Sequence, residues 1–363
     1  MSSRTVGVEE EFLLLDPATG ENLSVAEKVL GDLPEALRDR GHLEFRPCMV
    51  EMVTDVCTSL DELEDQLLRG RRAASRAADS HGAALVAIGA TPVRERSRVP
   101  SGSARFREIV EHYGPVGRDP AVCGCHVHVG VPDPEEAVAI CTRLRPWLPV
   151  IQALAVNSPL FEGDDTGYAS WRSIQLDRWP SLGPWPHLRS VADYERTVAS
   201  LIASGEMLDE SLVLWHARPS ASFPTVEVRI ADVCAEARDT VLVAALVRGL
   251  VDTVAGDGGG DGPEIPDAIL HAAHWNAARD GLAGTLLDAR TGRPCPAWDL
   301  VQEMVRCVTP ALRRHGDLER VTAGLDRIRR EGTAAARQRG IFAESGSVAV
   351  VLDHLAEATV HGA

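Results

Sequence analysis

Three short apolar segments of this chain each carry two chemically active side chains separated by a single residue. They contain Glu9-Glu10-Glu11, His126-Val127-His128 and Glu227-Val228-Arg229. Each segment is typical of a β-strand, in which residues i and i+2 share a face. Glu9 and Glu11 should therefore lie on one face and Glu10 on the other. Two carboxylates about 7 Å apart repel each other by roughly 2–3 kcal/mol at an effective dielectric constant near 20. The pattern thus predicts a bound cation or an arginine beside Glu9 and Glu11.

The other two segments follow the same rule. His126 should share a face with His128, and Glu227 should share one with Arg229. Carboxylates, imidazoles and an arginine that converge on one sheet face are typical of a site that binds metal ions and phosphate.

The composition limits what that site can be. The chain has 363 residues, of which 45% are hydrophobic, enough for one large domain or two small ones. Its net charge is −16, with 53 acidic and 37 basic residues. This balance argues against nucleic-acid and anionic-membrane partners, because both bind clustered positive charge.

Lysine is nearly absent, since Lys28 is the single lysine and the other basic residues are arginines. A lysine-dependent phosphate loop, a kinase-type lysine and a Schiff-base enzyme are therefore disfavoured. If the protein handles a nucleotide, arginines and metal ions must hold its phosphates.

Eight cysteines occur at irregular spacings and none forms Cys-x-x-Cys, which favours buried free thiols over a disulfide framework. The N-terminus shows no signal-peptide pattern, and the longest apolar run, Val241 to Val247, is too short to span a membrane. We therefore expect a cytoplasmic protein.

Strand and helix patterns alternate along the chain, which predicts an α+β fold with a mainly antiparallel sheet and helices packed on one side of it. Ser59 to Glu62 forms a capping box that opens a helix. Residues 157–190 are typical of a long structured loop, and the glycine-rich residues 256–262 of a surface linker. The chain from Pro266 onward should be almost entirely helical.

The segment from Leu43 to Cys57 has the pattern of a strand interrupted at Pro47. Glu44 and Glu51 are seven residues apart in it, so a regular strand would place them on opposite faces. A bulge at Pro47 would be needed to bring both to one site.

Several motifs in this order resemble those of the bacterial glutamate–cysteine ligase-like carboxylate–amine ligases. They are Gly7-Val-Glu9-Glu10-Glu11-Phe12, Glu51-Met-Val-Thr54, Gly124-Cys-His126-Val-His128-Val-Gly130, Asn157-Ser158-Pro159, Arg218-Pro219, Thr225-Val-Glu227-Val-Arg229-Ile-Ala-Asp232, Ala278-Arg279-Asp-Gly281 and Gly332 to Arg339. The resemblance covers most of the chain.

This resemblance implies a glutamine-synthetase-like fold, in which an antiparallel sheet forms a half-open funnel that holds ATP and two or three Mg²⁺ or Mn²⁺ ions. It implies one catalytic domain over residues 1–363, with a mostly helical part from about 264, amino-acid substrates and a homo-oligomer, most simply a dimer. ATP would activate a glutamate-like carboxylate as an acyl phosphate, and an amine such as cysteine would displace the phosphate.

Roles follow for individual residues. Hard oxygen donors suit Mg²⁺ and Mn²⁺, and the candidate metal ligands are Glu9, Glu11, Glu44, Glu51, His126 and Glu227. His128 should contact nucleotide or substrate. Arg229 should hold the transferring phosphoryl group, and Arg218 a substrate carboxylate or phosphate.

Simpler interpretations stand beside these. Glu10 is expected to be a surface or salt-bridged residue, Glu44 a solvated carboxylate at a strand end, and His128 a structural histidine. Arg172 and Arg178 could bind substrate or stack on tryptophans, and Arg337 and Arg339 could complement a helix dipole. The tryptophans are expected to anchor the core and loops.

Two other classes of protein remain open at this point. A zinc metallohydrolase could use His126 and His128 with a carboxylate, and would need further histidines such as His216, His271 or His274. A non-catalytic binding module could also keep the fold.

Overall fold

The computed structural model describes residues 4–256 and 264–362, so most of the expected glycine-rich linker lies outside the described residues. A seven-stranded sheet has the order β10-β11-β5-β1-β3-β2, and β4 also pairs with β1. Every pairing in it is antiparallel, and β10 and β2 form its edges, so the sheet is not closed. The strands are β1 (Val6–Leu15), β2 (Gly41–Leu43), β3 (Met49–Val53), β4 (Ala84–Val86), β5 (Gly124–Gly130), β10 (Ala217–Pro219) and β11 (Thr225–Asp232).

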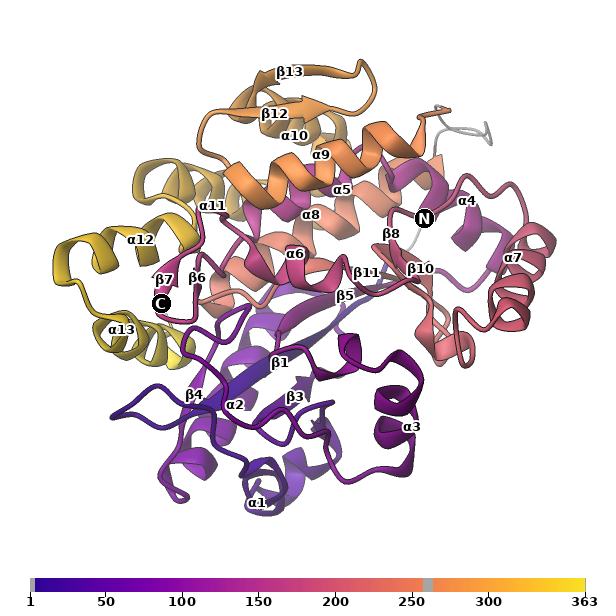
Figure 1. Ribbon diagram of the computed structural model, residues 1–363. Helices are drawn as coiled ribbons and strands as arrows, with labels where there is room; N and C mark the ends of the chain where they lie inside the picture. Colours follow the sequence, from indigo (N-terminus) through magenta and orange to yellow (C-terminus); the bar gives the residue numbers. More distant parts are fainter. Residues whose placement is uncertain (1–3, 257–263, 363) are drawn as a thin grey trace.

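Helices surround this sheet, with α9 and α10 above it and α11 to α13 at its left in the view of Figure 1. The helices are α1 (Ala26–Gly31), α2 (Leu60–Asp79), α3 (Ala104–Tyr113), α4 (Pro134–Leu144), α5 (Leu148–Leu154), α6 (Trp171–Leu176), α7 (Val191–Ser204), α8 (Ala237–Gly256), α9 (Asp267–Asp280), α10 (Ala297–His315), α11 (Leu318–Glu331), α12 (Ala334–Ser345) and α13 (Val348–Val360). The predicted α+β class is confirmed. No helix of the described residues is long and apolar enough to cross a membrane.

The side chains of strand β1 alternate between an outer and an inner face of the sheet, and the two faces have different environments. Val6, Val8 and Glu10 are buried on the outer face, against which α2 and α8 pack. Glu9 and Glu11 are partly exposed on the inner face. The expected capping box starts α2, because Ser59 Oγ accepts a hydrogen bond from the Glu62 amide. A buried apolar face and a half-open polar face are what the period-two pattern of β1 requires.

Glu10 is not a surface residue, although its expected salt bridge is present. It is 1% exposed, and its two carboxylate oxygens accept hydrogen bonds from Arg71 at 2.8 and 2.6 Å. Thr240 of α8 donates a third hydrogen bond at 2.6 Å. Arg71 also donates to the carbonyl oxygen of Thr359 near the end of α13. This ion pair therefore ties β1 to α2, α8 and the C-terminal helix.

The expected strand from Leu43 to Cys57, interrupted at Pro47, is wrong in its bounds, and no bulge at Pro47 brings Glu44 to Glu51. Residues 41–53 form a hairpin, in which β2 pairs antiparallel with β3 and His42 lies opposite Glu51. The connection between the strands carries Glu44 and Arg46. The buried guanidinium of Arg46 donates to three carbonyl oxygens of residues 98–119, which fixes the connection against the neighbouring segment.

Smaller elements complete the fold. Part of the region 157–190 is regular, because it contains β6 (Leu160–Phe161), β7 (Asp164–Asp165), α6 and β8 (Leu182–Gly183), which pairs in parallel with β9 (Leu214–Trp215). The chain after Pro266 is not entirely helical, because β12 (Thr285–Asp288) and β13 (Arg293–Pro296) form a hairpin between α9 and α10. A sharp chain reversal at Gly292, whose φ is 66°, accounts for this interruption.

Candidate active site

The register of the central strands brings the predicted polar residues onto the inner face. Glu11 of β1 lies opposite Glu51 of β3, and Glu9 of β1 lies opposite His126 of β5. On the next pair, His128 lies opposite Glu227 of β11. Arg218 of β10 lies opposite Glu227 in turn. Strands that are far apart in sequence thus present one continuous row of charged and imidazole side chains.

Two groups of ligand atoms lie close enough to hold divalent cations. Glu9, Glu51 and His126 form one group, and Glu11, Glu44 and Glu51 form the other, with the atoms of each group within 4.8 Å of one another. Glu51 belongs to both groups. Glu44 reaches the second group from the connection between β2 and β3. The hairpin, and not a bulge at Pro47, therefore brings Glu44 and Glu51 to one site.

Negative charge accumulates at Glu44 and Glu51 in these groups. Burial and, after it, the charge of the neighbouring Glu11 raise the pKa of Glu44 to about 8. Burial also raises the pKa of Glu51 well above its ordinary value, with Glu44 adding to the effect. Carboxylates that repel one another in a buried site are stabilised by a cation between them. Oxygen donors with one imidazole fit Mg²⁺ or Mn²⁺.

Both histidines of β5 contact Glu9. His126 Nδ1 lies 3.2 Å from one Glu9 oxygen, and His128 Nε2 lies 3.2 Å from the other. Burial alone would raise the pKa of Glu9, but the hydrogen bonds and charges of the two imidazoles outweigh it and the pKa is lowered. His128 Nδ1 also lies 2.9 Å from Thr225 Oγ1. The structure places His128 beside the first group and not within it.

Glu227 has a different environment from the other carboxylates. It is 2% exposed and accepts hydrogen bonds from Arg218 Nε at 2.9 Å and from Arg229 at 2.7 Å. Burial raises its pKa, but the two arginines outweigh burial and lower it to about 2. Neither group of potential ligands includes Glu227 among the described residues. Its role as a metal ligand stays a prediction, and the structure shows an anchor for two arginines.

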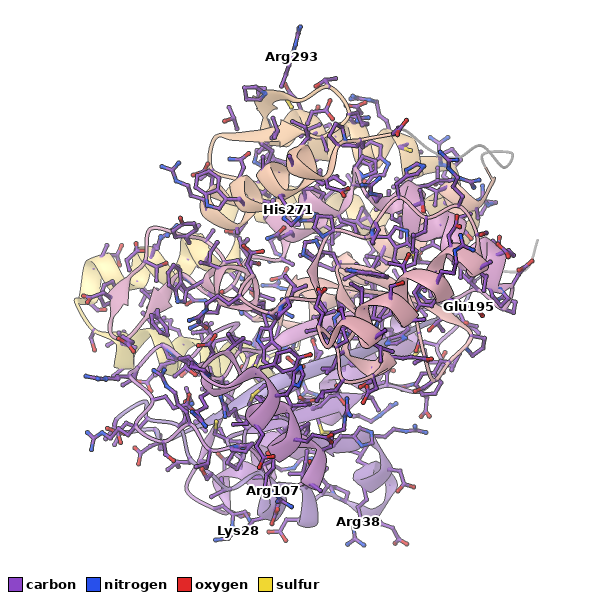
Figure 2. The ribbon with its side chains drawn as sticks, turned by 45° about the vertical axis from the view of Figure 1, so that its right-hand side comes forward. Lys28, Arg38, Arg107, Glu195, His271 and Arg293 are labelled. Carbon is purple, nitrogen blue, oxygen red and sulfur yellow. The ribbon has the colours of Figure 1, made fainter. Side chains whose placement is uncertain are left out.

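A cavity of about 640 Å³ opens beside these residues. Glu11, Glu44, His126 and Arg229 line it on the sheet side, and residues of α6 and α9 line it on the other. Most of its remaining wall is apolar, including Phe45, Ile109, Val116, Trp179, Leu182, Leu212 and Leu214. Lys28, by contrast, is exposed on α1 at the lower edge of the molecule, so the single lysine is remote from this site (Figure 2).

Arg172 is a cavity residue whose role the sequence left open. It is 4% exposed and stacks on no tryptophan ring among the described residues. Its guanidinium lies 3.4 Å from the carbonyl oxygens of Arg229 and Ile230, at the bulge of β11. Its Nε has no hydrogen-bond partner in the described chain. A Cβ at position 124 would lie only 3.0 Å from Arg172 Cζ, so Gly124 makes room for this guanidinium.

Other polar residues named in the sequence analysis form hydrogen bonds and ion pairs with one another or with neighbouring residues. Asn157 and Ser158 donate to Asp232, and Gln338 donates to Asn157. Arg337 forms ion pairs with Glu236 and Asp239, Arg339 pairs with Asp165, and Arg178 pairs with Asp119. Trp185 and Trp215 are buried anchors, as expected. Because each potential metal group holds at most one histidine within the described ranges, the donor set does not favour zinc.

Sequence reasoning gave little notice of three buried residues of the cavity wall. Gln152 stands in none of the sequence motifs, and the sequence suggests His216 and His274 only as possible zinc ligands. The structure joins the two histidines by a hydrogen bond of 3.1 Å. A sequence signal for this contact is lacking, because the residues are 58 positions apart.

Comparison with known proteins agrees with this arrangement. The model of glutamate-cysteine ligase family 2 matches residues 5–353. A protein of Salinispora arenicola with the provisional name glutamate–cysteine ligase 2 is 55% identical over 362 residues, which cover 99% of this chain and 96% of that protein.

Solved structures show the same fold at low identity. The glutamate–cysteine ligase of Francisella tularensis in complex with AMP superposes with a TM-score of 0.70 at 11% identity, covering 100% of this chain and 90% of that one. The bifunctional glutathione synthetase of Pasteurella multocida has a TM-score of 0.69 at 12% identity, and this chain, 98% of which is covered, spans 52% of its length. The fold is therefore that of the glutamine-synthetase-like ligases, and the chain belongs to glutamate-cysteine ligase family 2 and is an enzyme of the ligase class.

Proposed function

We propose that this enzyme is an ATP-dependent carboxylate–amine ligase that activates a glutamate-like carboxylate as an acyl phosphate. An amine, either cysteine or another amino acid, then displaces phosphate to give an amide, with ADP as the other product. The observation that carries this proposal is the pair of carboxylate groups sharing Glu51, with Arg229 beside them on the wall of one cavity.

The metal ions would be held by Glu9, Glu51 and His126 in one group and by Glu11, Glu44 and Glu51 in the other, with Glu227 as a further candidate ligand. When bound, Mg²⁺ or Mn²⁺ supplies positive charge that neutralises phosphate oxygens. The chain itself contributes mainly position and charge, as is general for phosphoryl transfer.

Arg229 is suited to hold the phosphoryl group. Within the described residues its guanidinium is oriented by one hydrogen bond to Glu227, which leaves other N–H donors for the cavity side. A planar, permanently charged donor matches phosphate oxygens. Arg218 donates from Nε and Nη2 to Glu227 and from Nη1 to the carbonyl oxygens of Ser211 and Val213. We therefore propose that Arg218 acts chiefly by orienting Glu227, and that His128 contacts the nucleotide.

The proposed pair of substrates rests on the name of the relative and on the cavity. Glutamate and cysteine are the pair named for the Salinispora arenicola protein. The buried Arg172 lies on the cavity wall, where a substrate carboxylate would meet its positive charge. The apolar remainder of the wall also accommodates larger amine side chains than cysteine.

ADP release measures the proposed reaction directly. We expect glutamate, ATP and Mg²⁺ to give slow ADP release, and an amine to accelerate it with formation of an amide. Hydroxylamine should trap the acyl phosphate as a hydroxamate that requires both ATP and Mg²⁺. Formation of AMP and pyrophosphate, or equal product without ATP, would refute the acyl-phosphate mechanism.

The proposal extends to the whole chain. We propose that residues 1–363 form a single catalytic domain with a mostly helical part from about 264, because one buried apolar cluster contains residues from Val6 to Ile328. We further propose a cytoplasmic homodimer that binds neither membranes nor nucleic acid. Light scattering of the purified protein tests the dimer, and a monomer at micromolar concentration would refute it.

A further inference from the structure

A chain of hydrogen bonds crosses the core from Asp232 to the wall of the cavity. Ser170 Oγ lies 2.8 Å from Asp232, and Ser173 Oγ lies 2.8 Å from Ser170 Oγ. Gln152 Nε2 lies 3.0 Å from Ser173 Oγ. His274 Nδ1 lies 2.6 Å from Gln152 Oε1, and His216 Nδ1 lies 3.1 Å from His274 Nε2. The metal groups and the two arginines of Glu227 take no part in it. We call these six residues the His216 chain.

Each hydrogen bond in the His216 chain has a defined direction. Asp232 accepts from the Asn157 amide and from Ser158 and Ser170, so Ser170 Oγ must donate to it. Ser170 then accepts from Ser173, and Ser173 accepts from the amide group of Gln152. The carbonyl oxygen of Gln152 is left to accept from His274 Nδ1–H.

The direction determines the tautomers of both imidazoles. With a proton on Nδ1, neutral His274 has only its Nε2 lone pair to offer to His216. His216 must therefore donate from Nδ1–H, which leaves its Nε2 as a lone pair without a proton. Among residues 4–256 and 264–362 the side-chain hydrogen bond of His216 uses Nδ1 and leaves Nε2 free, and His216 lines the cavity. A carboxylate-anchored chain thus presents one oriented proton acceptor to the cavity.

His216 also lies next to the proposed site of phosphoryl transfer. It follows β9, and its carbonyl oxygen accepts a hydrogen bond of 3.0 Å from the amide of Arg229. Both side chains line the same cavity. An amine that attacks an acyl phosphate held by Arg229 would therefore approach within the space that His216 faces.

We propose that His216 is a catalytic residue that takes the proton from the attacking amine, and that His274 and Gln152 are positioning residues that fix its tautomer. This inference rests on the proposed ligase function. In the step, the nitrogen lone pair forms the C–N bond to the acyl carbon. The C–O bond to phosphate breaks, phosphate leaves with that electron pair, and the proton lost by nitrogen passes to His216 Nε2.

The surroundings keep His216 unprotonated before the amine binds. Burial lowers the pKa of His216 well below its ordinary value, and nearby positive charge lowers it further. Burial lowers the pKa of His274 to about 3. Both imidazoles are therefore neutral at neutral pH. The groups that face His216 are His274 and His271 of α9, the latter labelled in Figure 2, Arg172 of α6 and Arg229 of β11.

The test separates the two half-reactions in a His216→Gln variant. Wild type and variant are compared for ADP release with glutamate alone, for hydroxamate formation with hydroxylamine, and for amide formation with cysteine. We expect His216→Gln to lower amide formation about 10²–10⁴-fold, as for loss of a general base. Glutamate-dependent ADP release should stay within about threefold of wild type by the same reasoning, because that step needs no base on nitrogen. Hydroxylamine is largely unprotonated at neutral pH, so hydroxamate formation should fall less than amide formation.

The pH profile distinguishes base catalysis from a structural role. Amide formation by the wild type should fall on the acid side as His216 becomes protonated, and His216→Gln should lack this limb. His274→Leu removes the acceptor that orients His216 Nδ1–H, so amide formation by this variant should also fall. Added imidazole should restore part of the amide formation of His216→Ala. His354→Gln, on the exposed side of α13, is the matched control and should equal wild type.

Two results would overturn the inference. One is amide formation by His216→Gln within threefold of wild type, and the other is an equal loss of ADP release and amide formation. Absence of glutamate-dependent ADP release in the wild type would instead refute the proposed function itself, and this inference with it.

Discussion

Strand β1 presents carboxylates to both faces of the sheet, and their environments differ. On the outer face, Glu10 meets a bidentate arginine and a hydroxyl donor. On the inner face, Glu11 has Glu44 and Glu51 as near neighbours, and the pKa of each of those two is raised. Glu10 is paired with an arginine, whereas no ion pair of Glu11, Glu44 or Glu51 is found among the described residues. The comparison indicates that the outer carboxylate serves the fold, and it supports the proposal that the inner carboxylates bind a cation.

Glu10→Gln should produce the largest effect, and on stability alone. Removing one partner of a buried ion pair leaves Arg71 uncompensated, so the free energy of unfolding should fall by about 3–5 kcal/mol. Urea denaturation measures it, with Glu11→Gln as the matched variant on the opposite face of β1. Glu11→Gln should keep its stability and lose activity. Equal stability of the two variants would refute the distinct structural role of Glu10.

Arg229→Lys should have the next largest effect, on rate. Lysine keeps the charge but loses the planar fork, and loss of one preorganised donor typically costs about 10²–10³ in kcat. Glutamate-dependent ADP release measures it, with Arg196→Lys on α7 as control, because Arg196 is exposed and pairs only with Asp193 within the described chain. Full turnover by Arg229→Lys would exclude the phosphoryl-binding role.

Glu51→Gln tests the proposed metal-binding role of the inner carboxylates. Glu51 belongs to both potential metal groups, so its loss should weaken both. Activity should fall at least about 10–100-fold, the range seen when even outer-shell partners of a metal are removed. Calorimetric titration with Mn²⁺ should show weaker binding, while the metal-free variant keeps the thermal stability of the wild type. Wild-type activity in both Glu51→Gln and Glu227→Gln would exclude the assignment of the metal site.

The smallest expected effect is a dependence of stability on pH. Glu44 holds its proton up to a pKa of about 8 in the folded protein, against an ordinary value of 4.5. Between these values the folded state binds more protons than the unfolded state, so the metal-free enzyme should lose stability as the pH rises from about 5 to 8. Glu227, with its pKa lowered to about 2, acts oppositely and loses its contribution only below about pH 4.5.

Thermal denaturation in EDTA and in Mn²⁺ tests this dependence. The midpoint in EDTA should be lower at pH 8 than at pH 6. Mn²⁺ should raise it more at pH 8, because fewer protons compete with the ion. Glu44→Gln should reduce the slope in EDTA. A midpoint in EDTA that rises steadily from pH 6 to pH 8 would contradict the raised pKa of Glu44.

Much of the sheet was predictable because short-range periodicity determines it. The alternation in β1 and β5 correctly separated Glu10 from Glu9 and Glu11, and paired His126 with His128 on one face. The burial of Glu10 was not predictable, because its partner Arg71 lies 61 residues away on a helix. The local pattern predicts on which face of the sheet a side chain lies, whereas the element packed against that face determines whether the side chain is exposed to solvent.

The site was less predictable where it depends on turns and on distant contacts. Glu44 enters through a hairpin that the sequence showed as a broken strand, since Pro47 is compatible with either. The His216 chain joins residues from five separate parts of the sequence, and none of its hydrogen bonds between elements has a local signature. The metal ligand roles of all six candidates remain predictions until metal binding is measured.

Because Gly124 has no side chain, the residues at positions 124 and 172 should change together during evolution. A methyl group there would collide with the guanidinium of Arg172, which lies against the bulge of β11. A lineage of this enzyme can therefore replace Gly124 only after Arg172 has shortened or moved, and it can restore Arg172 only while position 124 is glycine. Substitutions at the two positions should occur together, and Gly124→Ala should be tolerated better in an Arg172→Ala background than alone.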